Sequence, residues 1–190
     1  MSATSPLHSW QLRCARRSVL AGGVIAYPTE AVWGLGCDPW NREAVERILE
    51  LKQRPMHKGM ILVAASIDQV RFLLDPLPRV LQWEAEQHWP GPITCLVPDV
   101  LEQVPDWVRG KHRTIAVRVS DHPVVQALCN ATGMPLVSTS CNPAGRAPAR
   151  SIWHVRRYFG DELDRIVSGA LGGNRKPSRI IDIVTGKQFR

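Results

Sequence analysis

Short apolar runs alternate with capped amphipathic segments along almost the whole chain. The apolar runs predict strands at residues 24–27, 60–65, 94–97, 114–119, 136–138, 165–167 and 179–184. The segments between them predict helices at residues 6–21, 42–51, 67–74, 79–88, 122–131 and 151–159. Helices and strands that alternate in this order predict an α/β fold, although neither strand order nor strand direction follows from the pattern.

Polar side chains mark the expected helix starts. Asn41 and Asp121 each stand directly before a predicted helix, where a side-chain oxygen can accept a hydrogen bond from a free backbone amide. Residues 28–40, in contrast, contain Gly34 and Gly36 and are expected to be irregular. These glycines suit either a tight turn or the close approach of backbone to a ligand.

The composition is that of a globular protein with an excess of positive charge. The chain has 190 residues, which suit one domain spanning residues 1–190, and 24 basic against 17 acidic residues give a formal charge of +7. This charge indicates an anionic partner such as a nucleotide, a nucleic acid or a membrane surface, unless it serves solubility alone. No apolar run approaches the length of a membrane span.

Cysteine spacing and the absence of common phosphate motifs exclude several classes of site. The five cysteines form no CxxC pair, so neither a zinc knuckle nor a disulfide framework is expected, and free thiols fit a reducing cytoplasm. The sequence also lacks GxxxxGK[ST] and GxGxxG, so it has neither a P-loop nor a dinucleotide fingerprint. A phosphate site in this chain must therefore be built from other residues.

Two polar segments far apart in the sequence are the strongest candidates for such a site. One contains Lys52 and Arg54, whose side chains would point to the same side of an extended backbone and could bind a triphosphate. The other runs from Ser138 to Asn142 directly after an apolar strand, where loops commonly bind ligands. The two cations could instead complement the dipole of a helix C-terminus. The serines have no evident base in the sequence, which argues against an acyl-enzyme.

Two further polar features adjoin predicted strands. The segment from Tyr27 to Glu30, YPTE, lies where the first strand ends and suits either a ligand site or a tight turn. Arg118 is a charge inside an otherwise apolar strand, so it is expected either on a solvated face or in a cleft.

Taken together, these segments resemble one family, the YrdC/TsaC threonylcarbamoyl-AMP synthases in their short bacterial form. The agreement covers nearly the whole chain. It runs through residues 24–36, 51–55, 58–62, 89–94, 116–119, 121–123 and 138–142. The KxR motif is Lys52 to Arg54, and the SxN motif is Ser140 to Asn142. In this order and after the YPTE segment, the two motifs are highly specific for that family.

The resemblance implies a YrdC-like α/β fold, in which helices flank a twisted mixed sheet with a positively charged concave face. It implies a nucleotidyltransferase that converts ATP, L-threonine and bicarbonate into L-threonylcarbamoyladenylate and pyrophosphate. In the family this product serves tRNA threonylcarbamoyladenosine modification next to the anticodon, so a downstream tRNA threonylcarbamoyl-transferase complex is an implied partner. Mg²⁺ is expected to accompany ATP in the cytoplasm, with no metal-ligating residue assigned and no membrane contact.

The resemblance also assigns roles to single residues. It places Lys52 and Arg54 on the nucleotide phosphates as the catalytic residues, because positioning and charge neutralisation dominate nucleotidyl transfer. The other implied nucleotide-binding residues are Lys58, Thr114, Ser140, Asn142 and Arg190. The implied threonine-binding residues are Thr29, Arg118, Ser138 and Ser178, with Arg118 on the threonine carboxylate.

Some properties stay open at the level of sequence. The chain has Ala31 and Val63 where longer family members have threonine and histidine, which leaves the detailed threonine contacts unsettled. The alternative function is a double-stranded RNA or ribosomal RNA-binding module acting in ribosome maturation, with steep salt dependence and little sequence preference. Such a module would not explain the segment from Ser138 to Asn142. Oligomeric state, metal requirement, substrate binding order and RNA contact in the cell do not follow from the sequence.

Overall fold

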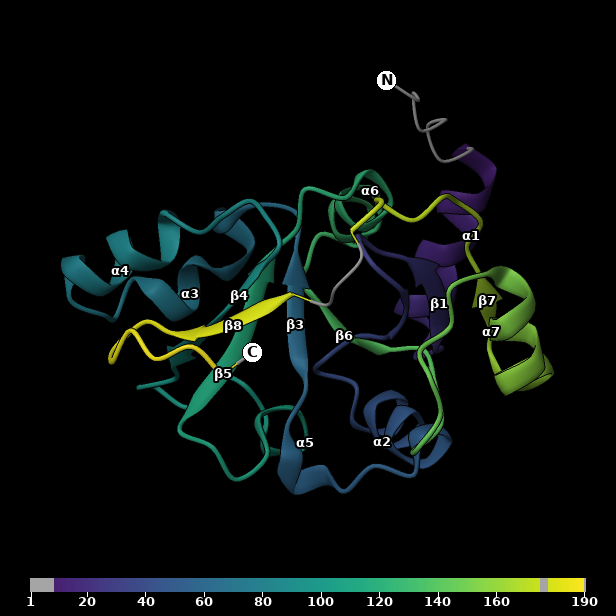
Figure 1. Cartoon of the computed structure of the whole chain (residues 1–190), viewed down its shortest axis with the longest axis horizontal. Helices are drawn as coiled ribbons and strands as arrows, with labels where there is room; N and C mark the ends of the chain where they lie inside the picture. Colours follow the sequence, from purple (N-terminus) through teal and green to yellow (C-terminus); the bar gives the residue numbers. More distant parts are fainter. Residues whose placement is uncertain (1–8, 175–177, 190) are drawn as a thin grey trace.

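The computed structural model describes residues 9–174 and 178–189, whose strands form one eight-stranded sheet with helices around it (Figure 1). The strand order is β7-β1-β2-β6-β3-β5-β4-β8. The pairs β1–β7, β3–β5 and β4–β8 are parallel, and the other neighbouring pairs are antiparallel. The predicted α/β fold with a mixed sheet is therefore confirmed.

The elements alternate along the chain much as the apolar pattern predicts. The strands are β1 (Ile25–Pro28), β2 (Trp33–Gly36), β3 (Ile61–Ala64), β4 (Ile93–Pro98), β5 (Thr114–Val119), β6 (Leu136–Ser140), β7 (Arg165–Ile166) and β8 (Arg179–Asp182). The α-helices are α1 (Ser9–Leu20), α2 (Arg42–Lys52), α3 (Arg71–Leu74), α4 (Arg79–Glu86), α5 (Asp106–Arg109), α6 (Pro123–Thr132) and α7 (Ile152–Phe159). The 3₁₀ turns are η1 (Met56–Lys58), η2 (Ile67–Val70) and η3 (Gly160–Glu162). None of these described helices is long and apolar enough to cross a membrane.

One of the two predicted helix caps is correct. Asn41 caps α2, since its side-chain oxygen accepts a hydrogen bond from a backbone amide of the first turn at 3.0 Å. At α6 the expected cap Asp121 is wrong by one residue, because His122 accepts the bond from the amide of Val124. The reason is Pro123, which favours the first helical position and restricts the residue before it to an extended backbone.

The strand β2 lies inside the segment that the sequence predicts to be irregular. It pairs antiparallel with β1 on one side and β6 on the other. Gly36 lies so close to β6 that a Cβ at this position would be 2.5 Å from the carbonyl oxygen of Val137. Glycine therefore serves the close packing of backbone here. In β2 the large apolar residues alternate with glycines rather than with polar residues, and glycines disfavour a strand assignment.

The two faces of the sheet are covered to different extents. On one face, strand side chains join α2 to α5 and α7 in a continuous core. On the other face, α6 packs against α1, and this pair covers side chains of β1, β3 and β6. The strand β5 turns Ile115, Val117 and Val119 into the continuous core, so Arg118 and the other alternate residues face the part of the sheet that α1 and α6 leave uncovered.

Gly36→Ala is expected to destabilise the fold. The added methyl group would meet the Val137 carbonyl and, at 2.8 Å, the ring of Tyr27, both of which are held within the sheet. Urea denaturation should show a free energy of unfolding lower by about 1–3 kcal/mol. Gly133→Asn is the control, since Gly133 has a φ of 74° that Asn tolerates and nothing within 4 Å. Equal losses in the two variants would contradict this account of Gly36.

Candidate functional site

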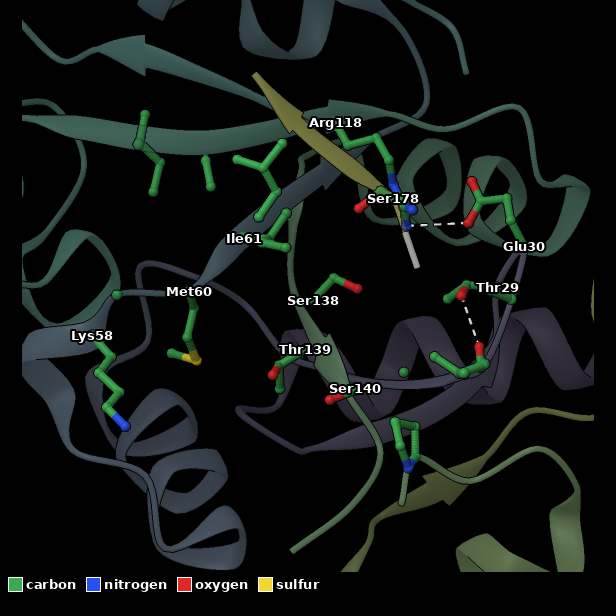
Figure 2. A pocket seen from close by; sticks show the side chains of 18 of the residues that line it. Thr29, Glu30, Lys58, Met60, Ile61, Arg118, Ser138, Thr139, Ser140 and Ser178 are labelled. Atoms are coloured by element: carbon green, nitrogen blue, oxygen red, sulfur yellow. Dashed lines mark hydrogen bonds and ion pairs between the residues drawn. The ribbon is translucent and has the colours of Figure 1, made fainter. Parts of the chain in front are cut away.

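A cavity of about 430 Å³ opens on the uncovered part of the sheet (Figure 2). Its walls include β2, β3, β5, β6 and the start of β8. Eight residues that the sequence predicts for nucleotide or threonine binding line it. They are Thr29, Arg54, Lys58, Thr114, Arg118, Ser138, Ser140 and Ser178. The fold thus brings residues from both predicted sets into one cavity.

Two predicted residues lie elsewhere, and the placement of a third is not described. Lys52 and Asn142 are not among the residues that line the cavity, and Arg190 lies outside the described residues. The ammonium of Lys52 donates hydrogen bonds to the backbone carbonyls of Ser140 and Asn142, the second at 2.9 Å. The carbonyl of Lys52 in turn accepts a hydrogen bond from the amide of Ala144 at 3.1 Å. The two motifs therefore meet in space, with Lys52 attached to the backbone of the SxN turn.

The backbone of the KxR motif is not extended, so that expectation is wrong. Lys52 is the last residue of α2, and Gln53 ends the helix in the left-handed conformation with φ 49° and ψ 46°. This turn separates the two cations: Lys52 is buried behind the SxN turn, whereas Arg54 reaches the cavity wall. The position of Lys52 also suits the dipole of the helix C-terminus, which the sequence left as an alternative.

One end of the cavity carries the cations Arg54, Lys58 and Arg109 and the imidazole of His112. The guanidinium of Arg54 donates to the carbonyl of Gly59 at 2.8 Å. Arg109 is paired with three carboxylates, the nearest at 2.6 Å. Arg54 and Lys58 have no carboxylate partner among the described residues, so their charges are available to an anion. Arg109 and His112 were not predicted, since the last residue of the short helix α5 and a loop position before β5 carry no motif that marks them.

The opposite end carries Arg118 and Glu30, as Figure 2 shows. A nitrogen of the Arg118 guanidinium lies 3.1 Å from a carboxylate oxygen of Glu30, and both side chains are buried. The Thr29 hydroxyl donates to the carbonyl of Val32 at 2.7 Å. The hydroxyl of Ser178 lies 2.9 Å from that of Thr94. Glu30 belongs to the YPTE segment, but no role was predicted for it. Its position next to Thr29, a predicted site residue, is the feature that could have indicated one.

Small and hydroxyl-bearing residues connect the two ends. Ser138, Thr139 and Ser140 lie between Lys58 and Arg118 in Figure 2. Gly34 stands opposite them, and a Cβ there would lie 3.3 Å from a methyl group of Thr29 and 3.5 Å from the hydroxyl of Ser138. Because Gly34 has no side chain, it leaves space between the Arg118 end and the hydroxyl row formed by Ser138, Thr139 and Ser140.

The charges of the site suit an anionic ligand better than a resident metal ion. Within the described residues, no group of three His, Cys, Asp or Glu side chains could hold a metal ion. Glu30 is the one carboxylate among the described residues that line the cavity, and it is paired with Arg118. The donor set does not fit a protein-bound divalent cation, so any metal would have to enter on the ligand.

Comparison with known proteins assigns the chain to a family. The Sua5/YciO/YrdC family profile, described as "Telomere recombination", matches residues 17–190. The threonylcarbamoyl-AMP synthase of Marinobacter nauticus is 80% identical over the full length of both chains. The protein of the same name from Pseudomonas aeruginosa is 59% identical, covering 97% of this chain and 98% of its own.

The fold also matches a solved structure with a bound amino acid. The crystal structure of P. abyssi Sua5 complexed with L-threonine superposes with a TM-score of 0.85 at 31% identity. The match covers 94% of this chain and 52% of that one. This chain therefore spans about half the length of that protein.

The burial of Lys52 predicts a pH dependence of stability. Burial lowers the pKa of Lys52 from 10.5 to about 8, and the neighbouring Arg54 contributes to the lowering. Between these two pH values the unfolded chain binds a proton that the folded chain has released, so the contribution of Lys52 to the free energy of unfolding rises with pH. The rise should be no more than about 3 kcal/mol.

The measurement compares the parent chain with Lys52→Met by chemical denaturation from pH 7 to 10.5. Taking the difference between the two chains removes the titration of groups that both contain. The free energy of unfolding of the parent chain should increase relative to that of Lys52→Met as the pH rises. A flat difference, or a shift toward the variant, would show that the ammonium is not held at a lowered pKa.

Proposed function

The chain belongs to the Sua5/YciO/YrdC family, and we propose that its cavity is the active site of a threonylcarbamoyl-AMP synthase. The enzyme is a nucleotidyltransferase that uses ATP and L-threonine and serves tRNA modification. The observation that carries the assignment of the site is a single cavity with unpaired cations at one end and a buried arginine at the other. These ends suit the phosphates of a nucleotide and the carboxylate of an amino acid, respectively.

We place the triphosphate at the end with Arg54 and Lys58. Lysine provides a point charge and arginine a fork of donors, so together they can bind several phosphate oxygens. Lys52 uses two of its three N–H donors on the carbonyls of Ser140 and Asn142. Its proposed part is to hold the SxN turn and to add its charge to the phosphate site from behind, rather than to grip a phosphate in the open cavity.

The remaining predicted roles follow the same division. We keep Thr114, Ser140 and Asn142 as nucleotide-binding residues and Thr29, Ser138 and Ser178 as threonine-binding residues, together with Arg118 on the carboxylate. Placement in the cavity supports all of them except Asn142, whose side-chain amide donates to the carbonyls of Pro143 and Arg146. Asn142 then acts by shaping the turn. The threonine-bound structure of the related P. abyssi protein supports the amino-acid half of this assignment.

The chemistry needs position and charge rather than a covalent nucleophile. Threonine's amine combines with bicarbonate to give a carbamate and a molecule of water. A carbamate oxygen then attacks the α-phosphorus of ATP while pyrophosphate leaves. Arg54 and Lys58 neutralise charge on the leaving phosphates, and Arg118 holds the amino acid in line. Mg²⁺ enters with the triphosphate as part of the substrate.

We further infer that the product passes to a downstream tRNA threonylcarbamoyl-transferase complex in the cytoplasm. The carbamoyl-adenylate is a mixed anhydride and is labile in water, which favours prompt transfer. Direct contact with tRNA or double-stranded RNA is a further proposal, supported by the formal charge of +7. An RNA-binding role without chemistry is less well supported, since it gives no part to the cavity.

The test of the proposed function is pyrophosphate release from ATP. Purified protein, ATP, L-threonine and bicarbonate should give pyrophosphate, and omission of threonine or bicarbonate should abolish its formation. The adenylate should be recovered by chromatography in equal amount. Release that does not depend on threonine, or no release at all, would overturn the assignment.

Arg54→Ala is expected to weaken the use of ATP. One charge-assisted phosphate contact is worth roughly 1.5–3 kcal/mol, so kcat/KM for ATP should fall by roughly 10- to 150-fold. Steady-state kinetics with saturating threonine measures this. Arg157→Ala is the matched control, because Arg157 is exposed on α7 and is not among the cavity-lining residues. A loss of the same size in both variants would point to general charge rather than to a phosphate contact.

A further inference from the structure

Glu30 is a buried carboxylate to which the proposed mechanism gives no part. It lines the cavity directly after Thr29, and only 5% of its surface is exposed. A charge removed from water in this way is costly unless it is paired and hydrogen-bonded. Its partners therefore indicate what it does.

The two oxygens of the Glu30 carboxylate have different contacts: one accepts a hydrogen bond, and the other lies within ion-pair distance of Arg118 without a hydrogen bond. One oxygen accepts a hydrogen bond from the hydroxyl of Ser120 at 2.6 Å. That hydroxyl accepts from the amide of His122 at 3.1 Å, so its single hydrogen is directed to Glu30. The other oxygen lies 3.1 Å from Nη2 of Arg118. The carboxylate is therefore fixed on one side by Ser120 and faces the guanidinium on the other.

The backbone of Glu30 is fixed as well. Its carbonyl accepts from the amide of Asn174 at 2.9 Å, and the carbonyl of Thr29 accepts from the amide of Gly172 at 3.1 Å. A Cβ on Gly172 would lie 2.9 Å from the Cα of Glu30, so the two backbones are in close contact. These contacts fix the backbone of Glu30. Its carboxylate can therefore determine the orientation of the Arg118 side chain, rather than adjust to it.

His122 connects the same segment to α6. Its Nδ1 accepts from the amide of Val124, so the ring hydrogen is on Nε2, which donates to the carbonyl of Ala170 at 3.1 Å. The pKa of His122 is lowered by burial, which favours this neutral ring. The hydrogen-bonded residues around Glu30 are thus neutral, and Arg118 is the charged group with which Glu30 is paired.

Arg118 has a donor to spare. Its Nε is buried and has no hydrogen-bond partner in the described part of the chain. The guanidinium is planar with five N–H donors, and the ion pair of Nη2 with Glu30 attracts that end of it toward the carboxylate. Nε itself is covered, so a carboxylate in the cavity would pair with the terminal nitrogens of this side chain.

We propose that Glu30 is a positioning residue for the amino-acid substrate: its ion pair with Arg118 fixes the guanidinium so that its terminal nitrogens are presented to the substrate's α-carboxylate. This inference rests on the proposed function, since it takes the amino acid to bind at the Arg118 end. Glu30 acts through Arg118 and does not touch the substrate, because the oxygen that faces Arg118 is itself covered.

The first test is Glu30→Gln, which keeps the size of the side chain and removes its charge. The amide would present either a neutral oxygen or a donor to Arg118, so the guanidinium loses its fixed orientation. KM for threonine should rise roughly 10- to 100-fold, the range for a charge-assisted hydrogen bond, while KM for ATP stays within about twofold. Glu50→Gln, on the exposed face of α2, is the matched control and should leave both constants unchanged.

Two further variants separate positioning from folding. Glu30→Asp keeps the charge and should recover part of the threonine affinity that Glu30→Gln loses. Ser120→Ala removes one support of the carboxylate and should raise KM for threonine by a smaller factor, with no added effect in combination with Glu30→Gln. If Glu30→Gln fails to fold, as judged by thermal denaturation, Ser120→Ala carries the comparison. An equal rise in both KM values would overturn the proposal.

Two inhibitors identify which part of the amino acid depends on Glu30. L-Threoninol lacks the carboxylate, and 3-hydroxybutyrate lacks the amine; each is measured as an inhibitor competing with threonine. Glu30→Gln should weaken 3-hydroxybutyrate as much as threonine and leave L-threoninol unchanged. If Glu30→Gln weakened the binding of L-threoninol alone, Glu30 would bind the ammonium directly, which contradicts the proposal. If the parent chain forms no pyrophosphate with threonine, the proposed function fails, and this is seen before any variant is compared.

Discussion

The buried ammonium of Lys52 is the contact on which the geometry of the cavity depends. It lies at the end of α2 and binds the backbone carbonyls of Ser140 and Asn142 at the end of β6. The carbonyl of Lys52 adds a further link to the same turn, since it accepts a hydrogen bond from the amide of Ala144 at 3.1 Å. Because a buried charge must be satisfied by hydrogen bonds, both carbonyls and the ammonium hold one another in place. The wall between the two ends of the cavity is fixed in this way.

The cavity itself results from incomplete coverage of one sheet face. The helices α1 and α6 cover β1, β3 and β6, while β5 carries Thr114, Ala116 and Arg118 toward the uncovered part. A buried sheet with both faces covered would read as continuous apolar runs. The polar and small residues at alternate positions of β5 are thus the consequence of a face left open for a ligand. The opposite face supplies the stability, since its side chains join a continuous core.

Much of the fold was predictable because strands and helices differ in the period of their apolar residues. The predictions failed where that signal is absent or where a neighbour overrides it. Half of strand β2 is glycine, which disfavours a strand assignment, and its formation depends on pairing with β1 and β6. The cap of α6 moved from Asp121 to His122 because the following proline takes the first helical position. The short helix α5, Asp106–Arg109, has too few residues to show a period.

By itself the sequence determined most of the helices and strands, the family resemblance and eight of the residues that line the cavity. Motifs carry such information because a ligand requires particular chemical groups wherever they stand in the chain. Only the tertiary structure decided the separate positions of Lys52 and Arg54. Because of the left-handed turn at Gln53, Lys52 lies behind the cavity wall and Arg54 lines the cavity. It alone also paired Glu30 with Arg118, since the contact joins residues far apart in sequence through a loop and a strand whose register local patterns do not encode.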